Sequence, residues 1–371
     1  MQICIVAGAR PNFIKVAPVI RTVVKAKEQG RDVDYKLVYA GCEDDPTLEG
    51  TLFEDLQIAR PDVFLDVDCV NLNELTGQVM SAFERYLQQN KTDVVIVVDD
   101  LASTMAAAIV TKKQGILLAH LAAGTRSFDI TMPKEINRLV IDGLSDILFT
   151  AGMSNNSIAN KEGAELSKVY MVGNVLIDNI RYNKTRLVRP AVLDTLGVKD
   201  GGYIVFTLNR KALMAARENL KEMLATMTEK AAGTPIIAPL RGETAVTVRA
   251  LLAEGCGEVP AWFHIVEPLG YLEFGYLTAH AKGIITDSGN VAEEATFNGV
   301  PCITLNSYTE HIETVKIGSN ELVGEDPEKL RTMTERLVNG QWKKSAIPDR
   351  WDGRSAERIV STLLEYNKNK R

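Results

Sequence analysis

The segment 7–12 (AGARPN) could bind a phosphate group, since it follows an apolar run and precedes an amphipathic one. Gly8 permits close approach of the backbone, and the start of the following helix offers unpaired N–H groups. Arg10 adds a cation with bidentate geometry. The segment lacks the G-x-G-x-x-G spacing of dinucleotide sites, so a tight turn with a solvated arginine is the alternative interpretation.

A second segment, 286–290 (TDSGN), also lies between a strand-like and a helix-like run. Ser288 and Gly289 can present a hydroxyl and backbone donors to a diphosphate. Glu294, one turn into the helix, can accept hydrogen bonds from a ribose diol. This pattern predicts a nucleotide pocket. The alternative is a helix that is merely N-capped, with Asp287 or Ser288 as the cap.

Polar side chains also follow the strand-like run 94–98 and occupy the stretches 120–127 and 133–138. The adjacent carboxylates Asp99 and Asp100 invite comparison with a divalent-metal site, but neighbouring residues of a strand point to opposite faces. The four histidines lack the spacing of metal ligands, and the five cysteines include no C-x-x-C pair. We therefore expect neither a metal ion nor a disulfide framework.

The elements that would position these groups alternate in type. Short apolar runs such as 3–6 and 203–208 are followed by longer amphipathic stretches, which predicts the α/β fold class with two doubly wound, Rossmann-like parallel sheets. We expect an N-terminal domain over 1–173, a second domain over 174–352, and a helix within 353–371 that packs back on the first domain. Ligands of such sheets bind at the carboxyl ends of the strands, so a cleft between the two sheets is the expected site.

Composition narrows the classes of function. The chain has 371 residues, 46% of them hydrophobic, and a formal net charge of -6, which predicts two globular domains. The acidic balance disfavours nucleic acid or an anionic membrane as the main partner. No run of about 18 apolar residues occurs, and the first residues lack the pattern of a secretory signal. With unpaired cysteines, these features favour the cytoplasm.

Together these motifs resemble a known family, the non-hydrolysing UDP-N-acetylglucosamine 2-epimerases, whose fold is like that of the glycosyltransferase-B enzymes. The resemblance covers nearly the whole chain. The matching stretches, in chain order, are 8–11 (GARP), Asp100 at a strand end, 120–127 (HxxAGxRS), 133–138 (PxExNR), 172–178 (VGNxxID), 286–294 (TDSGxxxEE), the turn at 309–310 and 322–324 (LVG).

The resemblance implies interconversion of UDP-GlcNAc and UDP-ManNAc in a homodimer, without an added cofactor. UDP leaves by anti elimination and returns with the opposite configuration at C2, which needs a base, an acid and cations for the diphosphate. Matching the motifs residue by residue makes Asp100 one of the active-site carboxylates, and we expect Asp100, Glu135 and Lys134 to carry altered acid–base roles. Contacts to UDP or substrate are assigned to Arg10, Arg210, Ser288, Gly289, Glu294 and Glu310.

The chain departs from the family pattern at three proton-transfer or phosphate-contacting positions. Ala122 and Lys134 stand where the family has glutamates, and Asn209 stands where it has a histidine. Alanine and asparagine cannot exchange protons, and a lysine acid needs a lowered pKa, so we expect altered or impaired epimerase activity. The alternatives are a catalytically silent homologue that binds a sugar nucleotide or a partner in polysaccharide biosynthesis, and a UDP-sugar hydrolase.

Overall fold

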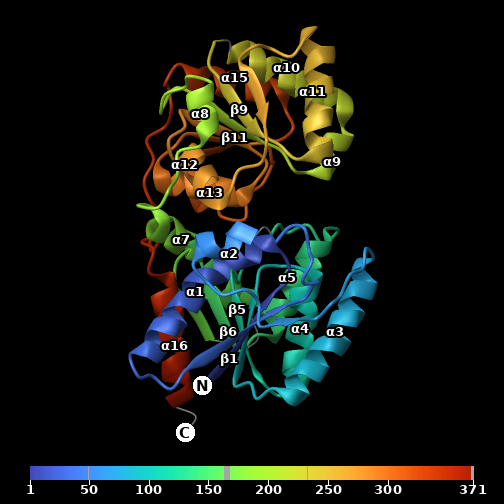
Figure 1. Ribbon diagram of the computed structural model, residues 1–371, viewed down its shortest axis with the longest axis vertical. Coiled ribbons are helices and arrows are strands. Elements are labelled where there is room, and N and C mark those ends of the chain that lie inside the picture. The colour runs from blue at the N-terminus through green and yellow to red at the C-terminus, as the bar shows by residue number, and fades with distance from the viewer. Residues whose placement is uncertain (49, 163–167, 232, 369–371) are drawn as a thin grey trace. The chain divides into compact units, whose positions relative to one another are not determined.

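The computed structural model describes residues 1–48, 50–162, 168–231 and 233–368 (Figure 1). Packing divides the chain into two units. The first comprises Met1–Tyr182 and the chain from Asp349 onward, and the second comprises Asn183–Pro348. Among the described residues, no helix combines the length and the apolar composition needed to cross a membrane.

The first unit is built on a seven-stranded sheet in the order β3-β2-β1-β4-β5-β6-β7, and every neighbouring pair is parallel. Parallel strands covered on both faces need continuous apolar runs, and the central strand, VVIVV, is fully buried. The strands are β1 (Gln2–Ala7), β2 (Asp34–Tyr39), β3 (Val63–Phe64), β4 (Val94–Val98), β5 (Leu117–Leu121), β6 (Ile147–Thr150) and β7 (Lys168–Met171).

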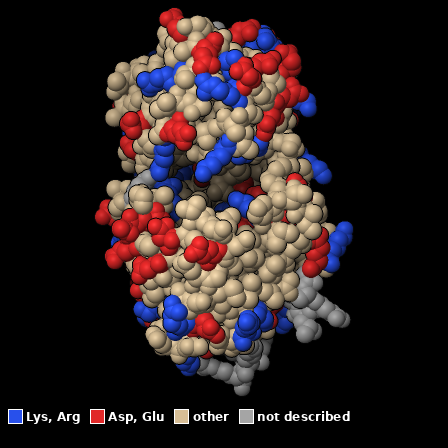
Figure 2. Space-filling view, turned by 90° about the vertical axis from the view of Figure 1, so that its right-hand side faces the viewer, with Lys and Arg blue, Asp and Glu red and all other residues tan. Residues whose placement is uncertain are grey.

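Helices cover both faces of this sheet. On one side α4 contacts both α3 and α5, and on the other side α1 contacts the C-terminal helix α16 (Figure 1). The helices of this unit are α1 (Arg10–Glu28), α2 (Gly50–Leu56), α3 (Leu72–Gln89), α4 (Ala102–Lys113), α5 (Pro133–Leu144), α6 (Met153–Glu162), α7 (Val175–Asn183) and α16 (Ser355–Lys368). Figure 2 shows that charged side chains are sparse across the middle of the face on the α3 side.

The second unit repeats the plan with a six-stranded parallel sheet in the order β10-β9-β8-β11-β12-β13. Its strands are β8 (Ile204–Thr207), β9 (Ile236–Pro239), β10 (Phe263–Val266), β11 (Gly283–Thr286), β12 (Cys302–Thr304) and β13 (Asn320–Leu322). Its helices are α8 (Ala191–Thr195), α9 (Lys211–Ala215), α10 (Arg217–Lys230), α11 (Gly242–Cys256), α12 (Tyr271–Ala279), α13 (Gly289–Asn298), α14 (Glu313–Lys316) and α15 (Pro327–Val338). The predicted pair of doubly wound sheets is confirmed.

The boundaries of the units lie at Tyr182 and Asp349 rather than at the predicted residues 173 and 352. The reason is the contact between α7 and α16. Asp178 of α7 accepts hydrogen bonds from the backbone N–H groups of Ser355 (3.1 Å) and Ala356 (2.8 Å), and so caps the N-terminus of α16. This capping joins α7 and the returning chain to the first unit.

Asp178 predicts a pH dependence of stability. Burial raises the pKa of Asp178 from 3.8 to about 6, despite its two backbone donors. The folded state therefore binds the proton more tightly than the unfolded state, and stability falls as the pH rises from 4 to 7, by about 2 kcal/mol from this group. We expect the difference in unfolding free energy between wild type and Asp178→Asn, measured in urea, to change by that amount between pH 4 and 7. An identical difference at both pH values would contradict the assignment.

Candidate functional site

The carboxyl end of β4 carries two acidic side chains that point to different elements. Asp99 adopts a left-handed backbone conformation, with φ of +60°. Its Oδ1 lies 2.7 Å from Lys15 Nζ and its Oδ2 accepts a hydrogen bond from Asn12 Nδ2 (2.9 Å), both on α1. A left-handed φ favours glycine, so an aspartate at this position depends on these contacts. No group of three residues suited to hold a metal ion occurs among the described residues.

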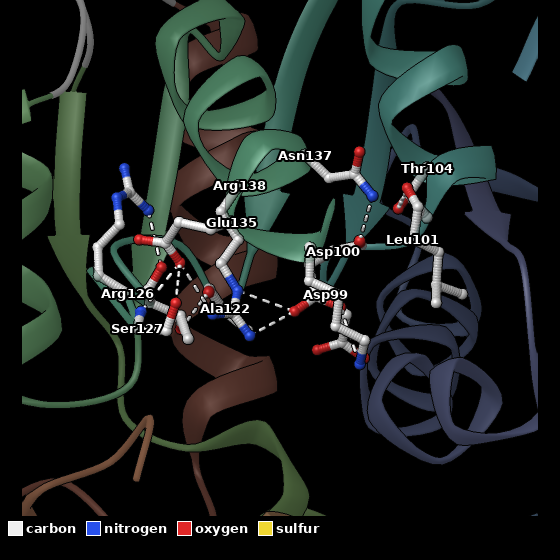
Figure 3. A network of polar contacts seen from close by, with 12 residues as sticks. Asp99, Asp100, Leu101, Thr104, Ala122, Arg126, Ser127, Glu135, Asn137 and Arg138 are labelled. Atoms are coloured by element: carbon white, nitrogen blue, oxygen red, sulfur yellow. Dashed lines mark hydrogen bonds and ion pairs between the residues drawn. The ribbon is translucent and has the colours of Figure 1, made fainter. Parts of the chain in front are cut away.

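Asp100 turns instead toward α5 (Figure 3). Its Oδ2 accepts hydrogen bonds from Arg138 Nε (2.8 Å) and lies 2.6 Å from Arg138 Nη2, while its Oδ1 lies 3.6 Å from Lys134 Nζ. Asn137 donates to the Asp100 carbonyl (2.8 Å). The side chain of Lys134 is 60% exposed and that of Asp100 is 12% exposed. Asp100 and Lys134 are thus a carboxylate and a cation in contact, with the lysine open to solvent.

Glu135 is fully occupied by hydrogen bonds inside the first unit (Figure 3). Its buried carboxylate accepts from Ser127 N (2.9 Å), Ser127 Oγ (3.0 Å), Phe128 N (3.0 Å) and Arg138 Nη1 (3.1 Å). Burial alone would raise the pKa of Glu135, but these donors outweigh it and the pKa is lowered. Glu135 is therefore an ionised group that shapes the loop before α5, which disfavours the predicted role in proton transfer.

Ala122 follows β5 directly, beside the end of β4, and also has a left-handed backbone, with φ of +63°. Figure 3 shows it among Glu135, Arg138 and the aspartates. Its methyl group brings no proton donor or acceptor to this point. Sequence reasoning missed Lys15 and Arg138 as partners of the two aspartates. For Arg138, the sequence offered one signal: it lies three residues after Glu135 on one helix, a spacing that favours an ion pair between them.

In the turn before α1, the side chain of Asn12 binds two of the backbone N–H groups that could have bound a phosphate. Asn12 Oδ1 accepts hydrogen bonds from Gly8 N (2.9 Å) and Ala9 N (3.2 Å). A Cβ on Gly8 would meet Ser103 Oγ at 2.0 Å, so glycine is required here by packing. Arg10 begins α1 and is half-buried. The tight-turn interpretation therefore accounts for Gly8, and the backbone donors of this turn are occupied.

The N-terminus of α13 in the second unit is open, by contrast. Ser288 is its N-cap, and Ser288 Oγ accepts a hydrogen bond from Val291 N (3.5 Å). Gly289 is exposed, and the nearest described atom to a Cβ built there is Glu310 Oε2, 3.9 Å away. The positive end of the helix dipole lies at Ser288 and Gly289, with the Glu310 carboxylate as the nearest group to Gly289, and this helix start suits an anion.

Asp287 connects this helix start to the loop after β8. Its Oδ2 accepts hydrogen bonds from Asn209 N (2.7 Å) and Arg210 N (2.6 Å), and Asn306 Nδ2 donates to its carbonyl (3.0 Å). Arg210 Nη1 donates to Asn306 Oδ1 (2.5 Å), and Arg210 also pairs with Glu325. The structure therefore brings Arg210, Ser288 and Gly289 together at the carboxyl ends of the central strands β8 and β11.

Glu294 lies deeper in the same helix. Burial raises the pKa of Glu294 to about 8, with a further contribution from the charge of Glu293. The raised pKa favours the protonated form, which can donate as well as accept a hydrogen bond. The predicted contact to a ribose diol would involve this neutral acid.

Gly289 gives a direct test of the anion site. We expect Gly289→Ala to weaken UDP binding at least about tenfold, because a methyl group stands where a phosphate oxygen would meet the backbone, and to leave the fold intact, because the space is open. Isothermal calorimetry gives the dissociation constant. The matched control is Gly143→Ala in α5, where a Cβ also meets open space. Equal affinities in both variants would place the anion elsewhere.

Comparison with known proteins gives consistent matches over the whole chain. A family model described as UDP-N-acetylglucosamine 2-epimerase matches residues 25–364. A UDP-N-acetylglucosamine 2-epimerase of Methanocaldococcus jannaschii is 35% identical and spans 99% of this chain and 100% of its own. A UDP-2,3-diacetamido-2,3-dideoxy-D-glucuronate 2-epimerase of Pseudomonas aeruginosa is 31% identical over 87% of this chain and 88% of its own.

A solved structure supports the same grouping. The M. jannaschii UDP-GlcNAc 2-epimerase in complex with UDP-GlcNAc and UDP superposes with a TM-score of 0.85 at 33% identity, covering 98% of this chain and 100% of that one. Family and fold expected from the motifs are thus confirmed.

Proposed function

The chain belongs to the UDP-N-acetylglucosamine 2-epimerase family, and from this premise we propose that it binds UDP-GlcNAc or a close UDP-amino sugar and epimerises it slowly. The observation that carries the proposal is the open N-terminus of α13, where Ser288 and Gly289 can receive the diphosphate. Arg10, Arg210, Glu294 and Glu310 are the further proposed contacts to the nucleotide or sugar.

The proposed reaction follows the family's elimination and re-addition. A base takes the C2 proton while the bond from C1 to the diphosphate oxygen breaks, which leaves a 2-acetamidoglucal and UDP. UDP then returns to C1, and a proton is delivered to the other face of C2. We assign the acid and base roles to Asp100 and Lys134, because Lys134 Nζ lies 3.6 Å from Asp100 Oδ1. Glu135 holds the loop in place rather than moving protons.

The low expected rate follows from what the site lacks. General acid or base catalysis contributes about 10²–10⁴-fold per group. Ala122 supplies none, and Glu135 is engaged by four hydrogen bonds. These two observations favour a second candidate, a silent homologue that binds the sugar nucleotide without turning it over or that binds only a partner protein. Hydrolysis, with water in place of the returning UDP, is the third.

NMR of UDP-GlcNAc with the protein in D₂O separates these functions. We expect slow formation of UDP-ManNAc with deuterium at C2, and no deuterium incorporation with Asp100→Asn. An unchanged substrate together with measurable UDP affinity would instead establish the silent sugar-nucleotide binder. Free UDP with N-acetylmannosamine would establish a hydrolase. Absence of UDP binding would contradict both the enzyme and the sugar-nucleotide binder, and would leave the partner-binding homologue.

We also propose a homodimer in the cytoplasm. Two observations support a protein interface near α3: the face on the α3 side is sparsely charged (Figure 2), and the apolar side chains of Val70 and Leu72, just before and at the start of α3, are exposed. Light scattering should give about twice the chain mass of 40.7 kDa, and a single-chain mass would contradict the dimer. All five cysteines are free, which agrees with a reducing compartment.

A further inference from the structure

A buried histidine on β5, His120, contacts the backbone of Asp99 at the carboxyl end of β4. His120 Nδ1 lies 2.6 Å from Asp142 Oδ1, and His120 Nε2 lies 2.9 Å from the backbone carbonyl oxygen of Asp99. The side chains of His120 and Asp142 are 2% and 1% exposed. The ring therefore joins α5 to the turn that presents Asp99 and Asp100, and water has little access to it.

Both partners of this ring are acceptors. A carbonyl oxygen can only accept, so Nε2 must carry a hydrogen. The Asp142 carboxylate also accepts from Gly124 N (3.0 Å) and Arg126 Nη1 (2.7 Å). A carboxylate that accepts from a backbone N–H group and from a guanidinium is stabilised in its ionised, acceptor-only form, so Nδ1 must donate to it as well.

We propose that His120 is a positioning residue, a doubly protonated imidazolium that holds the Asp99 carbonyl and thereby fixes the direction in which Asp100 presents its carboxylate. The catalytic consequence rests on the proposed function, whereas the charge state of the ring does not. Nothing in the sequence motif alone distinguishes this role from direct contact with a ligand.

The backbone at Asp99 explains why such a holder is needed. A left-handed φ of +60° in a residue other than glycine is unfavourable by about 1 kcal/mol or more and persists only where the surroundings determine it. Lys15 and Asn12 hold the side chain of Asp99 from α1, and His120 holds its carbonyl from β5. With these contacts, the peptide that leads into Asp100 has one orientation.

The positive and negative charges around the His120 ring are equal in number. His120 and Arg126 are the cations, Asp142 is the buried anion between them, and Glu162 Oε2 lies 2.8 Å from Arg126 Nε. A neutral ring would leave Asp142 with Arg126 as its one cation. One ring nitrogen of His120 would then carry no hydrogen and would face either the Asp142 carboxylate or the Asp99 carbonyl oxygen. Two cations and two anions thus form a compensated cluster, which favours the charged ring.

Two matched variants separate positioning from bulk structure. The amide nitrogen of glutamine can replace Nε2, and that of asparagine can replace Nδ1. We expect His120→Asn to lower kcat about ten- to hundredfold, because the Asp99 carbonyl loses its donor, whereas His120→Gln stays within about threefold of wild type. KM and UDP affinity should be unchanged in both. Equal losses in the two variants would reduce His120 to a packing residue and overturn the proposal.

NMR provides readouts that need no turnover. We expect the wild-type spectrum at neutral pH to show protons on both ring nitrogens of His120, assigned by their disappearance in His120→Gln. The backbone amide signals of 99–101 should shift in His120→Asn and remain near their wild-type positions in His120→Gln. A singly protonated ring, or identical amide shifts in both variants, would overturn the proposal even if the epimerase activity were established. Absence of turnover with these NMR results intact would count against the proposed function alone.

Discussion

Restoring the three family groups at once, by Ala122→Glu, Lys134→Glu and Asn209→His, is expected to raise the rate of epimerisation at least about a hundredfold. Each group can contribute about 10²–10⁴-fold to proton transfer when correctly placed. The backbone accepts the changes. Ala122 already carries a Cβ at φ of +63°, so a glutamate adds no new backbone strain, and Lys134 and Asn209 are exposed.

The measurement is the initial rate of UDP-ManNAc formation, followed by NMR with UDP-GlcNAc as substrate. Non-additivity is expected, because groups that act on one proton-transfer step depend on one another, so the single variants should gain little. Asp100→Asn in the triple variant is the control, and it should remove the gain. A triple variant that folds and binds UDP but turns over at the wild-type rate would show that the geometry of the site has changed as well.

Arg138→Gln is expected to destabilise the first unit by about 3–5 kcal/mol. Arg138 is 4% exposed and joins two carboxylates, Asp100 at 2.6 Å and Glu135 at 3.1 Å. Removing its charge leaves two buried or nearly buried anions without their shared cation, which costs far more than the loss of a surface pair. Urea unfolding followed by circular dichroism gives the free energy, and hydrogen exchange of the α5 amides localises the effect.

The control for this change is an exposed ion pair. Arg217 and Glu254 have side chains that are 50% and 46% exposed, so Arg217→Gln is expected to cost less than about 1 kcal/mol. If both glutamine variants lose the same small amount, Arg138 does not carry the charge balance of the Asp100 and Glu135 cluster.

The fold was predictable because its signal is local. Strands that are buried on both faces must be continuously apolar, and β4 and β8 have this pattern in the sequence. The three-residue strand β13 was not predicted, since Asn320–Leu322 carries two polar side chains in three residues. Its place at the edge of the sheet requires less apolar character than a central position.

The placement of charges was less predictable because it depends on contacts between distant segments. Asp178 and Ser355 are 177 residues apart in the chain, and His120 and Asp142 are 22 apart. Glu135 matched a family motif, but only the structure shows four donors on its carboxylate. Sequence identifies such residues by type, whereas their role is fixed by the donors and acceptors that the fold brings to them.

The departures from the family pattern take on physical meaning in the structure. Asp99, next to the predicted catalytic Asp100, adopts a left-handed conformation, and its carboxylate is held by Lys15 and Asn12. Ala122 occupies a second left-handed position at the end of the neighbouring strand. These contacts agree with the proposal that the framework of the proton-transfer site is kept while its titratable groups differ, and that the start of α13 receives the diphosphate.

A crystal structure of the full chain with UDP is the most direct test of the retained nucleotide site. The diphosphate is expected at the N-terminus of α13, within hydrogen-bonding distance of Ser288 Oγ and the Gly289 backbone N–H. UDP bound elsewhere, or an α13 N-terminus without a diphosphate at saturating UDP, would contradict the proposed site and the function built on it.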